Sequence, residues 1–148
     1  VQPFISGEDH AIAVLSNEDG KIVDFYENSD NPGGNSYYIE TTGAFNESHK
    51  TKRMTMRLDT IMKTNNWQLP DLIKLDVQGA ELDVLRGAEN TLINCSDIIL
   101  EAQHVDYNDG APKFDEVNSY LESIGYDLVS IITKNEIDGD YHFQKKNK

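Results

Sequence analysis

The chain has 148 residues, a length that suits one domain with a buried core. It carries 13 Lys and Arg against 26 Asp and Glu, a formal net charge of −13. Such an acidic surface repels phosphate groups, so we expect neither nucleic acid nor a membrane surface as a partner. A single cysteine, Cys95, excludes an intrachain disulfide and a multi-cysteine zinc site. With no apolar run of about 18 residues, the length that spans a bilayer, we expect a cytoplasmic protein.

The first half of the chain has the pattern of short strands joined by polar loops. Residues 10–15 form an apolar run of strand length, and residues 21–27 alternate between apolar and polar side chains. The turn residues 17–20 lie between them, which predicts a hairpin. A loop over residues 28–36 follows.

Two more elements complete this half. Residues 53–58 alternate again and predict a strand. Asp59 has the residue type of a helix N-cap, so we expect it to begin a short helix over residues 60–64.

The second half alternates strands with helices. Apolar patterns predict strands over 71–77, 97–102, 126–133 and 141–144, and helices over 80–92 and 114–124. Alternation of this kind is typical of a parallel sheet flanked by helices, and the short turn before the last strand makes the final pair antiparallel. We therefore expect a single α/β domain over residues 1–148, with its ligand at the carboxyl ends of the strands.

One segment carries a family resemblance. Residues 69–88, LPDLIKLDVQGAELDVLRGA, resemble the signature of the FkbM-type methyltransferases, which is close to P-D-hydrophobic-I-K-I-D-V-E-G-A-E and is followed by a helix ending in R/K-G-A. Within this core, Gln78 stands where the family usually has Glu. Further similar segments extend the resemblance to about residues 11–132, namely 13–16, 33–36, 57–60 and 98–104.

The resemblance implies a Rossmann-like class I methyltransferase sheet, mostly parallel with a C-terminal antiparallel hairpin. It also implies S-adenosylmethionine as the cofactor and methyl transfer to an acceptor, usually a hydroxyl on a sugar or small natural product. The expected partner is thus a small-molecule or carbohydrate acceptor.

Related enzymes hold the cofactor at a glycine-rich turn after their first strand, and no such turn precedes Leu15. We therefore expect the N-terminal strands and helices of the fold to be missing from this chain and to lie before Val1 in a longer protein. An incomplete sheet would leave an edge at which two copies could pair as a homo-oligomer.

Asp76 is the leading catalytic candidate because it ends a predicted buried strand. Its carboxylate could orient the acceptor hydroxyl, take its proton, or lie near the cofactor sulfonium; the alternative is a cap on the next helix. Glu101 and His104 follow the neighbouring strand and could join it around the hydroxyl. The three could instead bind a divalent metal, but they lack local metal-ligand spacing, so we predict no metal site.

Cofactor contacts are predicted at the same edge. Ser16 and Asn17 end an early strand and could approach the adenine, while Asp76 and Val77 lie within the signature. Glu81 follows in the first helical turn, where the helix dipole favours a negative charge, so a structural role is as well supported as a catalytic one.

A rival hypothesis is a non-catalytic Rossmann-like domain that binds a glycan or a protein partner. The absent cofactor loop and the Gln78 departure motivate it. A nucleotide-dependent α/β enzyme of another kind has less support, because no phosphate-binding glycine-rich loop with a lysine occurs.

Overall fold

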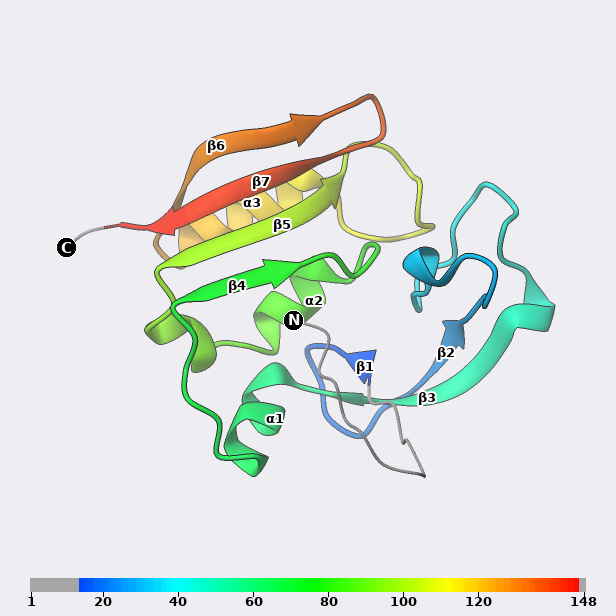
Figure 1. Cartoon of the computed structure of the whole chain (residues 1–148), viewed down its shortest axis with the longest axis horizontal. Helices are drawn as coiled ribbons and strands as arrows, with labels where there is room; N and C mark the ends of the chain where they lie inside the picture. The colour runs from blue at the N-terminus through cyan, green and yellow to red at the C-terminus, as the bar shows by residue number, and fades with distance from the viewer. Residues whose placement is uncertain (1–13, 147–148) are drawn as a thin grey trace.

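A computed structural model describes residues 14–146, which form a mixed α/β arrangement with two sheets (Figure 1). The strands are β1 (Val14–Leu15), β2 (Ile22–Tyr26), β3 (Lys50–Met56), β4 (Leu72–Leu75), β5 (Asp97–Gln103), β6 (Tyr126–Lys134) and β7 (Asp138–Lys145). The helices are α1 (Leu58–Thr64), α2 (Glu81–Arg86) and α3 (Phe114–Ser123), with short 3-10 helices η1 (Pro32–Gly34), η2 (Glu47–His49) and η3 (Thr91–Ile93). Among residues 14–146, none of the helices has the length and apolar character that crossing a bilayer requires.

The larger sheet has the strand order β4-β5-β7-β6. Strands β4 and β5 are parallel, whereas β7 is antiparallel to both β5 and β6. The smaller sheet has the order β1-β3-β2, with β1 parallel and β2 antiparallel to β3. Both sheets are mixed, so the expectation of a mostly parallel sheet is not met within the described residues.

The predicted hairpin over residues 10–15 and 21–27 is wrong in its described part. Strands β1 and β2 do not pair with each other, because β3 lies between them. Residues 10–13 of the predicted first strand lie outside the described residues. Both strands pair with β3 across long sequence separations, as in Val14 with Thr55 and Ile22 with Met54, and local alternation carries no information about such a partner.

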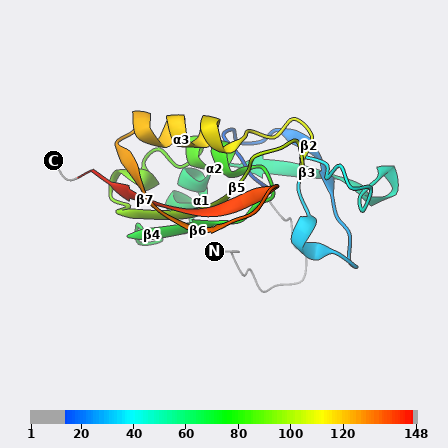
Figure 2. The same cartoon turned by 90° about the horizontal axis from the view of Figure 1, so that it is seen from above.

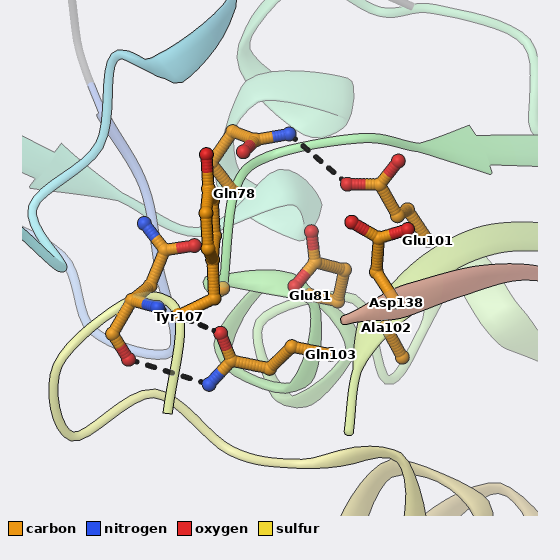
Figure 3. Close-up of a pocket in the computed structure, with 9 residues that line it drawn as sticks. Gln78, Glu81, Glu101, Ala102, Gln103, Tyr107 and Asp138 are labelled. Carbon is orange, nitrogen blue, oxygen red and sulfur yellow. Dashed lines mark hydrogen bonds between the residues drawn. The ribbon is translucent and has the colours of Figure 1, made fainter. Parts of the chain in front are cut away.

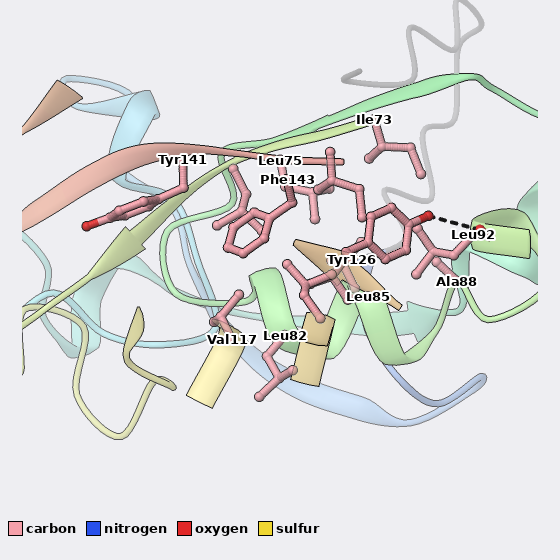
Figure 4. Packing of buried hydrophobic residues seen from close by; sticks show 14 of the residues in the cluster. Ile73, Leu75, Leu82, Leu85, Ala88, Leu92, Val117, Tyr126, Tyr141 and Phe143 are labelled. Carbon is pink, nitrogen blue, oxygen red and sulfur yellow. Dashed lines mark hydrogen bonds between the residues drawn. The ribbon is translucent and has the colours of Figure 1, made fainter. Parts of the chain in front are cut away.

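Helices α2 and α3 lie on the same face of the larger sheet (Figure 2). They bury a continuous apolar cluster against β4, β5 and β7 (Figure 4). Its fully enclosed members include Ile98, Leu100, Leu121 and Phe143. The buried Tyr126 hydroxyl donates to the carbonyls of Leu92 and Cys95, at 3.0 and 2.6 Å, which satisfies it inside the core. This packing fixes the strand ends on which the site is built.

Helix α2 is shorter than the predicted helix over 80–92. It ends at Arg86, and Gly87 follows as its C-cap. A Cβ on Gly87 would lie 2.1 Å from the carbonyl oxygen of Ser16, so glycine is required by the close approach of the β1 end. The glycine of the R-G-A motif thus brings the two sheets together.

Asp59 does not cap α1 as predicted. The N-cap is Arg57, and no side chain caps the helix. Asp19 lies beside this end, where its carboxylate accepts hydrogen bonds from the Arg57 amide and the Thr60 hydroxyl, both at 2.8 Å. Asp59 lies in the first turn of α1 and reaches across to accept bonds from Asn90 and Thr91 at the start of η3. It therefore ties α1 to the segment after α2.

Candidate active site

A small pocket lies where β4 and β5 end, at the carboxyl edge of their parallel pair (Figure 3). It has a volume of about 220 Å³, counting space open to solvent. Its lining is mostly polar and consists of Gln78, Gly79, Glu81, Glu101, Ala102, Gln103, Tyr107, Asn108 and Asp138.

The turn from β4 into α2 is built from two residues with left-handed backbones. Gln78 has φ 51° and Gly79 has φ 95°. A Cβ on Gly79 would lie 2.6 Å from the Ala111 Cβ, so this position accepts only glycine. The Gln78 side chain lines the pocket. Because Gly79 has no side chain, Asn108 and Ala111 of the next loop can lie directly against the turn.

Asp76 and Glu101 meet through Gln78. The Gln78 Nε2 donates to Asp76 Oδ1 at 3.0 Å and to Glu101 Oε1 at 3.1 Å. Partial burial and the nearby charge of Asp76 raise the pKa of Glu101, and the bond from Gln78 opposes that rise. The two carboxylates that the sequence placed at this edge are thus brought together, as parallel strand ends require.

Glu81 is the most enclosed acid of the pocket, with only 4% of its surface exposed. Its Oε1 accepts a hydrogen bond from the Val77 amide at 3.0 Å. Burial raises the pKa of Glu81 from its ordinary 4.5 to about 7, with smaller contributions from the charges of Glu101 and Asp76. Near neutral pH this group can therefore hold or release a proton, a property that its place in the first helical turn did not reveal.

Gln103 fixes the loop that forms another wall of the pocket. Its Oε1 accepts from the Asn108 amide at 2.9 Å, and its Nε2 donates to the carbonyls of Asn108 and Ala111 at 3.3 and 3.1 Å. The side chain is buried, so these bonds lie out of water. Sequence reasoning missed Gln103; the available signal was a polar residue ending an otherwise apolar strand.

Tyr107 and Asn108 are held on a second side by the 37–43 loop. The Thr41 amide donates to the Tyr107 carbonyl at 2.8 Å, and the Asn108 Nδ2 donates to the Tyr38 carbonyl at 3.0 Å. A segment far away in sequence therefore supports the pocket wall.

The other predicted site residues lie outside the pocket lining. His104 Nε2 is 2.7 Å from the Tyr141 hydroxyl, and its ring packs near Phe114. Ser16 is buried at the end of β1, where its hydroxyl lies 3.3 Å from Asn17 Oδ1.

Val77, the remaining predicted cofactor contact, packs against the core cluster and gives its amide to Glu81. The structure therefore brings Asp76 and Glu101 together and adds Gln78, Glu81 and Gln103. Within residues 14–146, no group of three or more His, Cys, Asp or Glu is arranged to hold a metal ion.

Comparison with protein families gives a match over this region. The model of the family described as the methyltransferase FkbM domain matches residues 6–128, which include both sheets' parallel pairs and every residue of the pocket except Asp138. Searches of curated proteins and of solved structures gave no match.

Proposed function

Because the chain belongs to the FkbM methyltransferase domain family, we propose that it uses S-adenosylmethionine to methylate a hydroxyl group on a sugar or small natural product. The observation that carries the proposal is the meeting of Asp76 and Glu101 beside a pocket at the carboxyl edge of β4 and β5, inside the family match. Ligands of open α/β sheets bind at such an edge. The comparisons do not favour the alternative, a non-catalytic binding domain.

The charges of the site suit the reacting end of this cofactor. When bound, S-adenosylmethionine supplies an activated methyl group on a positively charged sulfur. The carboxylates of Asp76 and Glu101 would attract that charge, with Asp138 adding to the negative potential of the pocket.

The same carboxylates can serve the acceptor. A hydroxyl in the pocket would donate its hydrogen bond to Asp76 or Glu101, which aligns the oxygen for attack and receives its proton as the methyl group moves. A positioned proton acceptor contributes about 10²–10⁴-fold to rate.

The test is calorimetric titration with S-adenosylhomocysteine, followed by a methyl-transfer assay on a panel of sugars and hydroxylated small molecules. Asp76→Asn should lower kcat/KM by about 100-fold without loss of folding, because it removes the proton acceptor but keeps the shape. Asp71→Asn is the matched control, since Asp71 is an exposed carboxylate just before the opposite end of β4. The titration is made on the complete protein, with any residues that precede Val1 included, and absence of S-adenosylhomocysteine binding by that protein would refute the proposal.

A further inference from the structure

Gln78 is the one residue of the pocket that departs from the family signature, where glutamate is usual. Its amide nitrogen lies between two carboxylates, 3.0 Å from Asp76 Oδ1 and 3.1 Å from Glu101 Oε1. An amide nitrogen has two hydrogens, so it can donate one to each carboxylate at the same time. The side chain thus acts as a neutral bridge between two negative groups, and Figure 3 shows its bond to Glu101.

The surroundings make that bridge necessary. Glu101 is also approached by the charges of Asp138 and Asp140 from β7, in addition to Asp76. The other side of the pocket adds Glu81 from α2 and the Tyr107 phenol from the loop. Of the residues that line the pocket, none is Lys, Arg or His. In a partly buried acidic setting, hydrogen bonds from neutral donors are what keep a carboxylate ionised.

We propose that Gln78 is a positioning residue that holds the Asp76 and Glu101 carboxylates together, and that glutamate at this position would break the pair. That Asp76 and Glu101 act in catalysis rests on the proposed function. A glutamate side chain would remove the donor and add a third negative charge within hydrogen-bond distance of the other two. Asp76 and Glu101 would then repel it, and Glu101 would take up a proton more readily.

The backbone separates this role from that of a simple turn residue. With φ at 51°, position 78 has a conformation that glycine or asparagine adopts at lower cost than glutamine. Gln78→Gly therefore keeps or relaxes the backbone while removing the amide, and it tests the side chain alone.

The experiment is a carboxyl-carbon NMR titration of the ligand-free chain, with the Glu101 resonance assigned from Glu101→Gln. We expect its midpoint to rise in Gln78→Gly, which loses a donor, and to rise further in Gln78→Glu, which also adds a charge. Gln68→Glu is the matched control, because it adds the same charge at an exposed position before β4 and should leave Glu101 unchanged. Gln78→Asn should restore part of the wild-type titration, since it retains an amide.

Activity gives the second readout. In Gln78→Glu the ratio of kcat/KM at pH 8 to that at pH 6 should rise about tenfold, as expected when a like charge raises the proton affinity of a catalytic carboxylate. An unchanged Glu101 titration in both Gln78→Gly and Gln78→Glu would overturn the proposal. Because the NMR titration needs neither cofactor nor acceptor, it decides the role of Gln78 even if S-adenosylhomocysteine does not bind and the proposed function fails.

Discussion

The two sheets of this protein are stabilised in different ways. The four-stranded sheet is covered by α2 and α3 and buries the continuous apolar cluster between itself and these helices. Large apolar side chains are about half exposed on both sheets, with Leu72 and Ile131 on the larger sheet and Met54 on the smaller one. The smaller sheet differs in that, of its strand residues, only Leu15 packs against that cluster. Apolar burial therefore positions the strand ends of the pocket, while the smaller sheet depends on specific polar and backbone contacts for its place beside them.

Those contacts gather around α2 and the segment after it. The Tyr37 and Tyr38 hydroxyls both donate to Asp83 Oδ2, at 2.9 and 2.8 Å. Burial, and the charge of Asp83, raise the pKa of both phenols, so they remain donors at physiological pH. Gly87 adds the close approach to Ser16. The junction is thus built from directional contacts, each of which can be removed singly.

The largest expected effect lies in the apolar half. Leu100→Ala should lower the free energy of unfolding by about 4 kcal/mol, because Leu100 is fully buried and its truncation leaves a cavity in the core. Met54→Ala, a truncation on the smaller sheet, should cost less than about 0.5 kcal/mol because Met54 is half exposed. Urea unfolding measures both. Equal losses in the free energy of unfolding would show that apolar burial stabilises the two sheets to the same extent.

The next effect lies at the junction. Gly87→Ala should cost about 3 kcal/mol, because its Cβ would overlap a backbone oxygen that no side-chain rotation can move away. Gly33→Ala is the control: a Cβ there would meet nothing within 4 Å. Thermal unfolding of the two variants gives the comparison. If Gly87→Ala were as stable as Gly33→Ala, the close approach of the sheets at Ser16 would be wrong.

A third effect comes from the acid enclosed beside the apolar core. Since the folded state raises the pKa of Glu81 from 4.5 to about 7, the folded protein binds the proton more tightly than the unfolded chain does. The contribution of Glu81 to stability should then be greatest below pH 4.5, fall as pH rises towards 7, and level off above it, with a full cost of about 3 kcal/mol. Glu81→Gln keeps an oxygen for the Val77 amide but does not ionise, so it should remove this dependence.

The measurement is urea unfolding of wild type and Glu81→Gln at pH 5 and pH 8. The variant should gain stability relative to wild type at pH 8 and differ little from it at pH 5. Parallel pH profiles of the two proteins would contradict the burial of an ionisable Glu81.

The sequence predicted the helix-covered half better than the other half, and the reason is physical. Strands β4 and β5 and helix α3 bury regular apolar faces, so their periodicity is visible along the chain. Asp76 and Glu101 could be placed at one edge because each ends a strand of a parallel pair. The local rules failed where a distant segment decides the outcome: β3 separates β1 from β2, and the Ser16 carbonyl leaves no room for a side chain at Gly87.

The same limit applies to the site. Gln103 and Glu81 matter because of what covers them, and burial by a loop or helix cannot be seen in residue type alone. Gln78 was visible as a departure from the family signature, but its two carboxylate partners lie at the ends of different strands and meet only in three dimensions. His104 follows β5 closely in sequence, yet its ring turns towards Tyr141 instead of the pocket.

The smallest of the four effects concerns the hydrogen bonds by which Asp59 joins α1 to η3, and it measures how much they contribute to the free energy of unfolding. Asp59 Oδ1 accepts from the amide and hydroxyl of Thr91, and Oδ2 accepts from the amide and side chain of Asn90. Burial raises the pKa of Asp59, but these bonds outweigh it and lower the pKa overall. Asp59→Asn retains one oxygen and loses about two of the four bonds, for a cost of about 2 kcal/mol.

This cost should depend on pH in the sense opposite to that of Glu81. A carboxyl whose pKa is lowered by folding stabilises the protein above its unfolded pKa, and the contribution is lost as pH falls through the folded value. Wild type and Asp59→Asn should therefore differ most near neutral pH and converge in acid, whereas Glu89→Gln, an exposed carboxylate beside the same turn, should change stability little at any pH. A constant difference down to acid pH would mean that the asparagine variant is destabilised for reasons of shape, and that the carboxylate charge contributes nothing to holding α1 against η3.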